Sequence, residues 1–422
     1  MKLLVVGEGG REHALIRKLK ENPAAETVYC LPGNAGIARD AVCVPIGPTE
    51  IDKIVAFAYE NKIDFAVVAP DDPLVLGCVD ALEGHGIPCF GPRANAAIIE
   101  GSKVFAKDLM KKYGIPTAAY ETFTDLDAAL EYLKTAPIPI VVKADGLALG
   151  KGVTVAMTQK EAEDAVVEAM RDGKFGESGR RLVIEEYLTG PEVSVLAFTD
   201  GECVKPMVSS MDHKRIYDGD EGPNTGGMGT IAPNPYYTDE IARECMETIF
   251  LPTMRAMNEE GRTFRGCLYF GLMLTPNGPK VIEYNCRFGD PETQVVLPLL
   301  KSDLLTVMQA TAAGKLKDTP VEWKDGSACC VVVASGGYPV SYKKGYPITL
   351  PDEVAPDVFI AGAAEKDGQL VTSGGRVLGV TATGNTLEDA IREAYRKTVQ
   401  VGFENAFYRK DIGARALAAK KN

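Results

Sequence analysis

Apolar and polar positions alternate in short blocks along the N-terminal part of the chain. Runs rich in β-branched residues, typical of buried strands, are separated by stretches with helical periodicity. The pattern predicts strands at Lys2–Val6, Thr27–Leu31, Asp64–Val68 and Ile87–Phe90, and helices at Arg11–Asn22 and Thr49–Asn61. Strands that alternate with helices form βαβ units with parallel strands. We therefore expect an α/β, parallel-sheet domain over residues 1–101.

The pattern changes in the middle of the chain, where strands follow one another more closely. Strands are predicted at Ile138–Val142, Val153–Met157, Leu182–Glu186, Val193–Phe198, Cys267–Leu274 and Lys280–Asn285. The last region has strands at Ala328–Ala334 and Gly375–Ala382, followed by a helix at Leu387–Val401. Both regions are typical of α+β domains, and we place them at 102–326 and 327–422.

Composition narrows the functional class. The 422 residues include 45% apolar and 25% charged positions, as in an ordinary globular protein, and carry a net charge of −12. No basic excess is available for nucleic acid or an acidic membrane surface. The apolar run that ends at Val6 is too short for a signal peptide, and no run approaches the ~18 residues of a membrane span, so we expect a cytoplasmic protein. With three histidines, and ten cysteines without C-x₂-C spacing, the chemistry is expected to depend on carboxylates, lysines and backbone groups.

Two glycine turns follow the first two predicted strands. Gly7-Glu8-Gly9-Gly10 opens a helix, whose N-terminal N–H groups can bind a phosphate. Glu12 stands where the dinucleotide fingerprint requires glycine, which disfavours NAD. The second turn, Gly33-Asn34-Ala35-Gly36, lies at the same carboxyl edge and favours a crevice for a small ligand. The alternative is a tight turn that binds nothing.

The segment from Lys143 to Gly152 resembles a P-loop but departs from it at Asp145 and Gly152. It joins two predicted strands, so a hairpin over a phosphate chain fits better. Lys143 lies on a mostly apolar strand and would need an anion, unless it is an edge lysine whose ammonium reaches water. The acidic turn Glu185–Glu192 follows a strand end that can recognise an adenine edge, with Glu192 on the ribose, or it is simply a solvated turn.

Two further segments combine charge with glycine or amide groups. Asp212–Arg215 precedes the loop Gly222–Gly229, whose N–H groups can form an anion nest, although a mobile surface loop is the alternative. Glu283 and Asn285 share one face of a strand, about 6–7 Å apart, and offer the hard oxygen ligands that Mg²⁺ prefers. Arg287 follows at the strand end and can clamp a carboxylate or a phosphoryl group. An ordinary polar edge strand is equally consistent with this pattern.

Taken together, these segments resemble the ATP-grasp superfamily and, within it, the phosphoribosylamine–glycine ligase family. The resemblance runs from end to end and is carried by Gly7–His13, Gly33–Gly36, Gly150–Val153, Asp212–Arg215, Gly222–Gly229, Asn285–Gln294 and Thr372–Val377. It implies an N-terminal substrate domain, an ATP-grasp body with a lid inserted at about 122–191, whose hairpin Gly146–Gly152 closes over ATP, and a C-terminal domain behind it. It also implies the ATP-dependent joining of glycine to 5-phosphoribosylamine in purine biosynthesis, with Mg²⁺ or Mn²⁺, by a monomer or small homo-oligomer.

The resemblance assigns roles to particular residues. Metal binding falls to Glu283 and Asn285, and the catalytic set is Arg287, Lys214 and Asp212. ATP would be bound by Lys103, Lys143, Lys151, Glu185, Glu186, Tyr187, Leu188 and Glu192. Substrates would be bound by Gly9, Gly10, Arg11, Glu12, Gly33, Asn34, Ala35, Asp71, Gly226, Gly227, Met228 and Asp290.

Three positions depart from the family pattern. Tyr269–Leu272 occupies the place where many ATP-grasp enzymes carry a second acidic metal ligand, and Phe359-Ile360 stands where a histidine is usual. Asp71 replaces a longer acid, and we expect it either to bind phosphoribosylamine or to cap a helix that begins near Pro73. Two rival functions are another ATP-grasp ligase or carboxylase, which the long Gly222–Gly229 loop disfavours, and a non-catalytic nucleotide-binding protein, which the intact charged residues disfavour.

Overall fold

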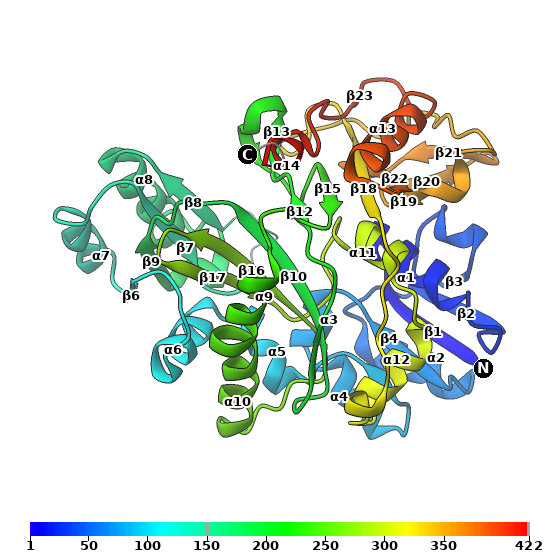
Figure 1. Cartoon of the computed structure of the whole chain (residues 1–422), viewed down its shortest axis with the longest axis horizontal. Coiled ribbons are helices and arrows are strands. Elements are labelled where there is room, and N and C mark those ends of the chain that lie inside the picture. The colour runs from blue at the N-terminus through cyan, green and yellow to red at the C-terminus, as the bar shows by residue number, and fades with distance from the viewer. Residues whose placement is uncertain (148–151, 420–422) are drawn as a thin grey trace.

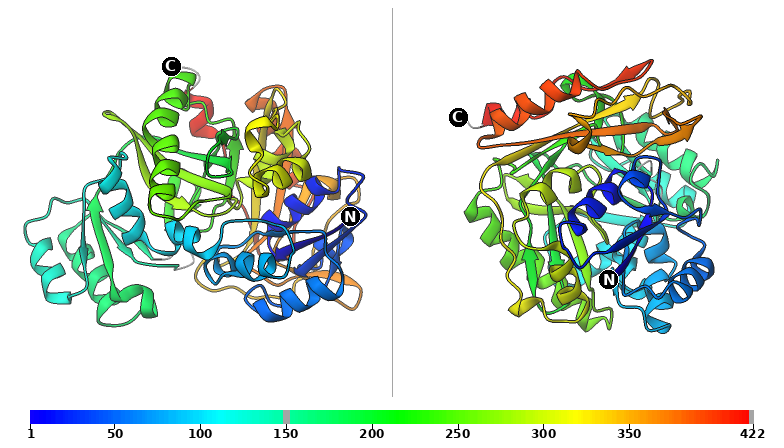
Figure 2. Two further views of the ribbon diagram at one scale, coloured as in Figure 1. Left: turned by 90° about the horizontal axis from the view of Figure 1, so that it is seen from below. Right: turned by 90° about the vertical axis from the view of Figure 1, so that its right-hand side faces the viewer.

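The computed structural model describes residues 1–147 and 152–419. Four larger sheets and two β-ribbons organise the described chain. In Figure 1 the N-terminal domain lies at the lower right, the C-terminal domain at the top, and a separate outer sheet at the left. Figure 2 shows that this outer sheet projects away from the other domains. The multidomain α/β and α+β fold class predicted from the sequence is confirmed.

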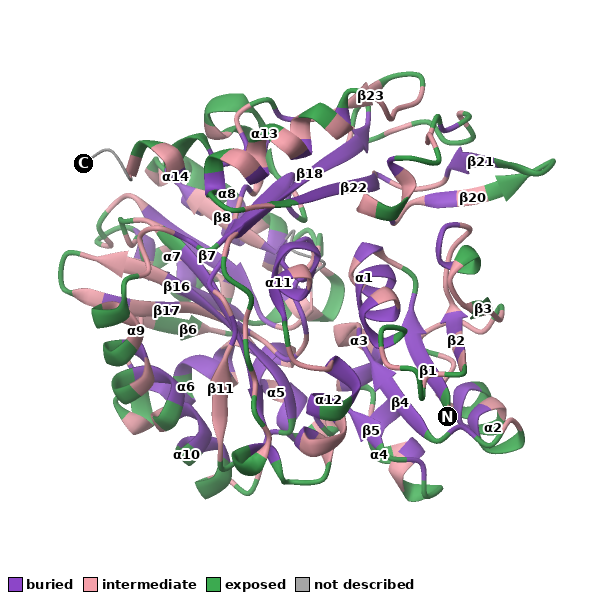
Figure 3. Ribbon diagram, turned by 45° about the vertical axis from the view of Figure 1, so that its right-hand side comes forward, coloured by how far each residue is buried: buried purple, intermediate pink, exposed green. Residues whose placement is uncertain are grey.

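The N-terminal domain is a parallel sheet in the order β3-β2-β1-β4-β5. Its central strand β1 is buried, because helices cover the sheet on its faces (Figure 3). The strands are β1 (Lys2–Gly7), β2 (Thr27–Pro32), β3 (Val42–Cys43), β4 (Phe65–Val68) and β5 (Cys89–Phe90). The helices are α1 (Gly10–Leu19), α2 (Ile51–Glu60), α3 (Asp71–Val75) and α4 (Cys78–Gly84), and α5 (Ala94–Gly101) and α6 (Lys103–Tyr113) lead out of the domain.

The middle region, which is predicted to form the ATP-grasp body and is called the ATP-grasp region below, contains two four-stranded antiparallel sheets. The outer sheet has the order β6-β9-β7-β8 and packs against α7 (Leu126–Leu133) and α8 (Gln159–Met170). Its strands are β6 (Tyr120–Phe123), β7 (Ile140–Ala144), β8 (Val153–Ala156) and β9 (Leu182–Glu186). The central sheet has the order β11-β10-β16-β17, with strands β10 (Glu192–Thr199), β11 (Val204–Pro206), β16 (Gly266–Thr275) and β17 (Gly278–Asn285). Between helices α9 (Asp239–Cys245) and α10 (Leu251–Glu259), Phe250 packs on Phe270 of β16, with 4.2 Å between the ring centroids.

The C-terminal sheet is not built from the C-terminal region alone. Its order is β12-β15-β18-β22-β19, and β12 (Met211–Asp212) and β15 (Gly229–Ala232) come from the ATP-grasp region. The other strands are β18 (Ser327–Ser335), β19 (Val358–Ile360), β22 (Arg376–Gly384) and β23 (Ala406–Phe407), with helices α13 (Leu387–Thr398) and α14 (Ala414–Ala419). The Gly-rich loop Gly222–Gly229 therefore ends inside the sheet of a different domain.

Smaller elements complete the described chain. The ribbons are β13 (Arg215–Tyr217) with β14 (Glu221–Asn224), and β20 (Ala363–Lys366) with β21 (Gln369–Thr372). Helix α11 (Thr293–Leu299) lies between α1 and the C-terminal sheet, and α12 (Leu304–Ala312) contacts β5 of the N-terminal sheet and β16 of the central sheet. None of the helices in the described ranges is both long enough and apolar enough to cross a membrane.

Candidate active site

The first glycine turn places backbone N–H groups at the carboxyl edge of the N-terminal sheet. Gly9 N–H donates to Glu12 Oε2 at 2.6 Å, and Arg11 Nε donates to Glu12 Oε1 at 2.6 Å. Glu12 is 1% exposed, so its carboxylate holds the turn together from inside. Gly10 lies close to the ATP-grasp region, because a Cβ there would be 2.8 Å from Gln294 Nε2. Arg11 also crosses the domain border and donates to Phe288 O at 3.2 Å.

The second turn is fixed by one side chain. Asn34 Nδ2 donates to Glu8 O at 2.8 Å and to Ile360 O at 2.9 Å, while its Oδ1 accepts from the N–H groups of Gly36 and Ile37. Gly33 N–H donates to Gly7 O at 3.0 Å, which places the two turns side by side, and Ala35 N–H donates to Ala363 O. The two turns are therefore adjacent at this edge, and the ligand crevice between them stays a prediction.

Asp71 lies at the same edge, and its helix starts earlier than we predicted. α3 begins at Asp71 itself and Pro70 occupies the N-cap position, so Asp71 is not the cap of a helix that begins near Pro73. Burial alone would raise the pKa of Asp71, but the guanidinium groups of Arg287 and Arg11 outweigh it and the pKa is lowered. The charged carboxylate therefore faces two arginines, one from each domain.

On the ATP-grasp side, three buried charges meet between β7, β9 and α6. Lys143 and Lys107 both pair with the carboxylate of Glu185, the latter at 2.6 Å, and all three side chains are nearly inaccessible. Lys143 Nζ also donates to Ile282 O at 3.1 Å. Lys143 is therefore not an edge lysine with its ammonium in water, because its charge is buried and neutralised.

The carboxylate of Glu283 is surrounded by cationic side chains. Lys214 Nζ lies 3.5 Å from Glu283 Oε1. Burial alone would raise the pKa of Glu283, but Lys214, Lys143, Lys103 and Arg287 lower it to about 2. In turn, the Glu283 carboxylate raises the pKa of Lys214 well above its ordinary value. Glu283 is thus an ionised carboxylate, and Lys103 Nζ is held nearby by Gly146 O at 2.7 Å.

Asn285 and Arg287 continue this strand towards the N-terminal domain. Arg287 Nη2 donates to Asn285 Oδ1 at 3.1 Å and lies 3.1 Å from Glu100 Oε1. Glu100, at the end of α5, also accepts from Cys286 N–H at 2.7 Å. Arg287 therefore links the predicted metal ligands to Asp71 at the sheet edge, and its Nε is buried without a partner in the part of the chain that the structure describes.

The Gly-rich loop, Gly222–Gly229, packs against Asp212. Burial and the carboxylate of Glu292 raise the pKa of Asp212 well above its ordinary range. Gly227 packs directly on Asp212, since a Cβ there would lie 2.6 Å from Asp212 Oδ1, and Met228 is fully buried. Asp290 accepts from Gln294 Nε2 at 2.7 Å, beside the Gly9-Gly10 turn.

The residues predicted to bind adenine and ribose lie at the end of β9 and at the start of β10. Glu186 ends β9, and Tyr187 and Leu188 come directly after the strand end. A small recess is lined by Glu192, Lys214, Tyr269 and Glu283, which places the predicted ribose acid beside the predicted metal carboxylate. Lys151 and part of the hairpin Gly146–Gly152 lie outside the described residues. Ala144 N–H, at the end of β7, donates to Gly152 O at 2.8 Å.

The residues present suit a divalent ion bound together with a nucleotide. Glu283 and Asn285 supply hard oxygen ligands, and Gly271 pairs with Glu283 across the sheet where a second acid is usual. Within residues 1–147 and 152–419 no cluster of three or more His, Cys, Asp or Glu side chains could hold a metal. A divalent ion bound together with a nucleotide would also take oxygen ligands from phosphate and water.

Several residues of this site were missed from the sequence. Glu100 and Lys107 come from helices α5 and α6 and belong to no motif, so only their burial reveals them. Arg376 lies in the Thr372–Val377 segment, to which the resemblance assigns no role, yet it donates to Gly226 O at 2.9 Å. A lone arginine after two glycines was the available signal.

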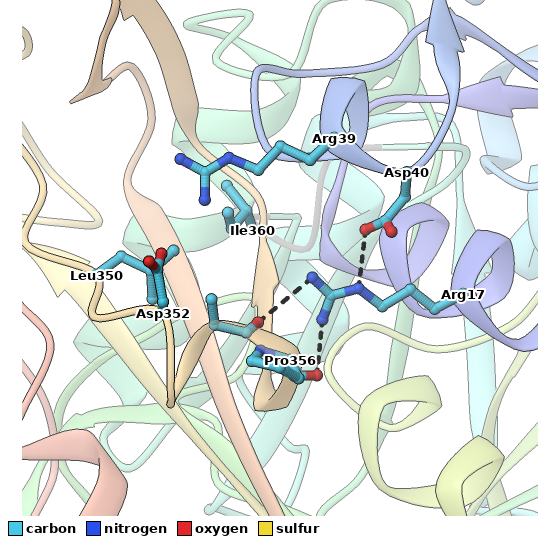
Figure 4. A pocket seen from close by; sticks show the side chains of 8 residues that line it. Arg17, Arg39, Asp40, Leu350, Asp352, Pro356 and Ile360 are labelled. Atoms are coloured by element: carbon cyan, nitrogen blue, oxygen red, sulfur yellow. Dashed lines mark hydrogen bonds and ion pairs between the residues drawn. The ribbon is translucent and has the colours of Figure 1, made fainter.

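A larger hollow of about 350 Å³ lies elsewhere, between the N-terminal and C-terminal domains (Figure 4). In it Arg17 is already engaged by Asp40 at 2.9 Å and by the carbonyls of Pro356 and Val358. These contacts join the N-terminal and C-terminal domains. None of the residues predicted for the site lines this hollow.

Comparison with known proteins agrees with this geometry. Models of the phosphoribosylglycinamide synthetase N domain, ATP-grasp (A) domain and C domain match residues 1–100, 101–293 and 328–415. A phosphoribosylamine–glycine ligase of Caldanaerobacter subterraneus is 50% identical over 98% of this chain and 100% of its own length, and one of Escherichia coli is 49% identical over both full lengths.

Solved structures give the same result. The crystal structure of the phosphoribosylamine–glycine ligase of Thermotoga maritima matches with a TM-score of 0.87 and 38% identity, covering 98% of this chain and 100% of that one. A biotin carboxylase of Campylobacter jejuni, at 15% identity and a TM-score of 0.74 over 100% of this chain and 95% of that one, shares the fold alone.

The sheets and the lysine-surrounded Glu283–Asn285 pair define an ATP-grasp enzyme, a class of ligase that uses ATP and a divalent metal. More narrowly, the chain belongs to the phosphoribosylglycinamide synthetase family.

Proposed function

We propose that this protein joins glycine to 5-phosphoribosylamine and converts ATP to ADP and phosphate, with glycinamide ribonucleotide as the product. The observation that supports this most directly is the junction at Arg287. This side chain connects Asp71, at the edge expected to bind the phosphoribosyl group, with the Glu283–Asn285 pair. Arg287 therefore lies between the edge expected to bind phosphoribosylamine and the residues expected to bind the metal and the phosphates of ATP.

The reaction requires activation of a carboxylate, because its oxygen is a very poor leaving group. Lys103 and Lys143 bind the phosphates of ATP, Glu185–Leu188 and Glu192 line its adenosine, and Arg287 and the Gly-rich loop orient glycine at the γ-phosphate. Glu283 and Asn285 hold Mg²⁺ or Mn²⁺, which when bound neutralises charge on the phosphate oxygens. Transfer of the γ-phosphoryl group to glycine gives glycyl phosphate and ADP.

The second step forms the amide. The amine of phosphoribosylamine donates an N–H to Asp71, which leaves its lone pair free to attack the carbonyl carbon of glycyl phosphate, and phosphate leaves. The proton that the nitrogen loses passes to the departing phosphate, and Asp212 supports the Gly-rich loop, because Gly227 packs on its carboxylate. Glycyl phosphate is prone to hydrolysis, so the outer sheet is expected to close over the site and exclude water.

A mass-resolved product assay tests this function. The enzyme is incubated with ATP, Mg²⁺, glycine and freshly made phosphoribosylamine, and we expect equal amounts of glycinamide ribonucleotide, ADP and phosphate. ADP that forms in a substrate-dependent way without glycinamide ribonucleotide would contradict the assignment. Replacing glycine by bicarbonate provides the control for a carboxylase.

A further inference from the structure

The turn before β22 in the C-terminal domain reaches the Gly-rich loop. Arg376, the first residue of β22, has only 22% of its side chain exposed. Its Nη1 donates to Gly226 O at 2.9 Å and to Asp290 O at 2.8 Å, and its Nη2 lies 3.5 Å from Asp290 Oδ2. One guanidinium group therefore joins the Gly-rich loop to the motif that carries Arg287.

Tyr338, also in the C-terminal domain, binds the other polar group of the same glycine. Gly226 N–H donates to Tyr338 Oη at 3.0 Å. Both partners need glycine beside them: a Cβ at Gly226 would lie 2.9 Å from Arg376 Cζ, and a Cβ at Gly375 would lie 2.2 Å from the Tyr338 ring. The C-terminal domain thus binds both the N–H and the carbonyl oxygen of Gly226.

The turn that carries Arg376 is itself attached to a buried strand. Ser335, at the end of β18, donates from its N–H to Gly375 O at 2.7 Å and from its Oγ to Gly374 O at 2.8 Å. β18 is the strand on which β15, the continuation of the Gly-rich loop, is also paired. Arg376 and the end of the loop therefore share one rigid support.

We propose that Arg376, assisted by Tyr338, is a positioning residue that fixes the Gly-rich loop for the amino-acid substrate. The C-terminal domain thereby contributes to the glycine and γ-phosphate end of the site without touching ATP. Charge-assisted bonds to carbonyl oxygens are strong enough to select one loop conformation. The inference rests on the proposed function, in which this loop faces glycine.

Steady-state kinetics of Arg376→Gln, Arg376→Lys and Tyr338→Phe test the proposal, with Arg396→Gln as the matched control. Arg396 is an exposed arginine of the same domain that pairs only with Glu393 among the described residues. We expect Arg376→Gln to lower kcat/KM for glycine by roughly 10- to 100-fold while the KM for ATP changes by less than about twofold. Arg376→Lys should recover part of the loss, Tyr338→Phe should lose less, and Arg396→Gln should match the wild type.

Hydrogen exchange of residues 225–229 gives a readout that needs no turnover. We expect faster exchange in Arg376→Gln and unchanged exchange in Arg396→Gln. Equal losses for glycine and ATP, or wild-type glycine kinetics and exchange in Arg376→Gln, would overturn the proposal. If the wild-type enzyme made no glycinamide ribonucleotide, the proposed function would fail, whereas the exchange result would still decide whether Arg376 orders the loop.

Discussion

At the N-terminal edge the amide of Asn34 is fully engaged by backbone groups, whereas the carboxylate of Glu283, in the ATP-grasp region, lies among the ammonium groups of three lysines and the guanidinium group of Arg287. Both residues were predicted to bind ligands. Side chains such as Asn34 and Glu12 build the two turns, while Glu283 is paired with Lys214 in a way that a charged ligand can replace. The two regions therefore differ in what a substitution removes. In the first it removes a support, meaning a side chain that holds a turn by hydrogen bonds to the backbone, and in the second it removes an expected contact with the ligand.

The largest effect is expected at Glu283. Glu283→Gln removes the charge on which the lysines converge and should lower kcat by at least ~100-fold, without unfolding the protein. Initial rates at saturating Mg²⁺ measure this, with the exposed Glu259→Gln as control. Near-normal turnover of Glu283→Gln would show that this carboxylate is not a ligand contact.

Asp71 tests whether any side chain of the N-terminal edge contacts substrate. Asp71→Asn should lower kcat/KM for phosphoribosylamine by roughly 10- to 100-fold, the range for a charged hydrogen bond, and leave the KM for ATP and the melting temperature almost unchanged. The neighbouring Asp72→Asn is the control. If Asp71→Asn were silent and Asp71→Ala only lowered stability, Asp71 would belong with the supports.

Asn34→Ala should show the opposite behaviour. Loss of its hydrogen bonds should lower the free energy of unfolding by about 1–2 kcal/mol, because water replaces some of them at this half-buried position. Thermal unfolding measures the change, with the exposed Asn95→Ala as control. An unchanged melting temperature together with a large loss in phosphoribosylamine use would make Asn34 a direct contact.

The smallest effect concerns His213, behind the Gly-rich loop. Its Nδ1–H donates to Gly229 O, its Nε2 accepts from Gly413 N–H, and burial lowers its pKa from 6.5 to about 4. Between these values the unfolded chain binds a proton that the folded chain does not, so this residue makes stability fall as the pH drops from about 6.5 towards about 4. Melting temperatures at pH 7 and pH 5 should differ less in His213→Gln than in the wild type or in the exposed His85→Gln. An equal difference in all three would exclude His213 as the source.

Much of the fold could be predicted because strand periodicity is local. β9 agrees with its predicted range, and β1, β10 and β17 differ by one or two residues at their ends. The participation of β12 and β15 in the C-terminal sheet could not be predicted, since both are short and pair with a strand far away in the sequence. The start of α3 was missed by two residues because Pro70, and not a side-chain cap, precedes it.

The candidate site residues could be taken from motifs, but their mutual contacts could not. Glu283, Asn285 and Arg287 come from one motif and Lys214 from another, and the structure brings the two motifs together. The roles of these residues stay predictions. Spacing did not reveal that Glu185 neutralises two lysines, because Lys107 comes from a distant helix with no motif. It also did not reveal the inward direction of Glu12, which depends on the geometry of the turn.

The mixed origin of the C-terminal sheet has a consequence for modularity. A chain cut before β18 would leave β15 without its partner and expose the unpaired edge of a strand that is now wholly buried. Exposed, unpaired strands of this kind invite association between molecules. The boundary between the last two domains is thus a poor place to divide this enzyme. A C-terminal domain that is exchanged, by recombination or by design, needs β12 and β15 to complete its sheet.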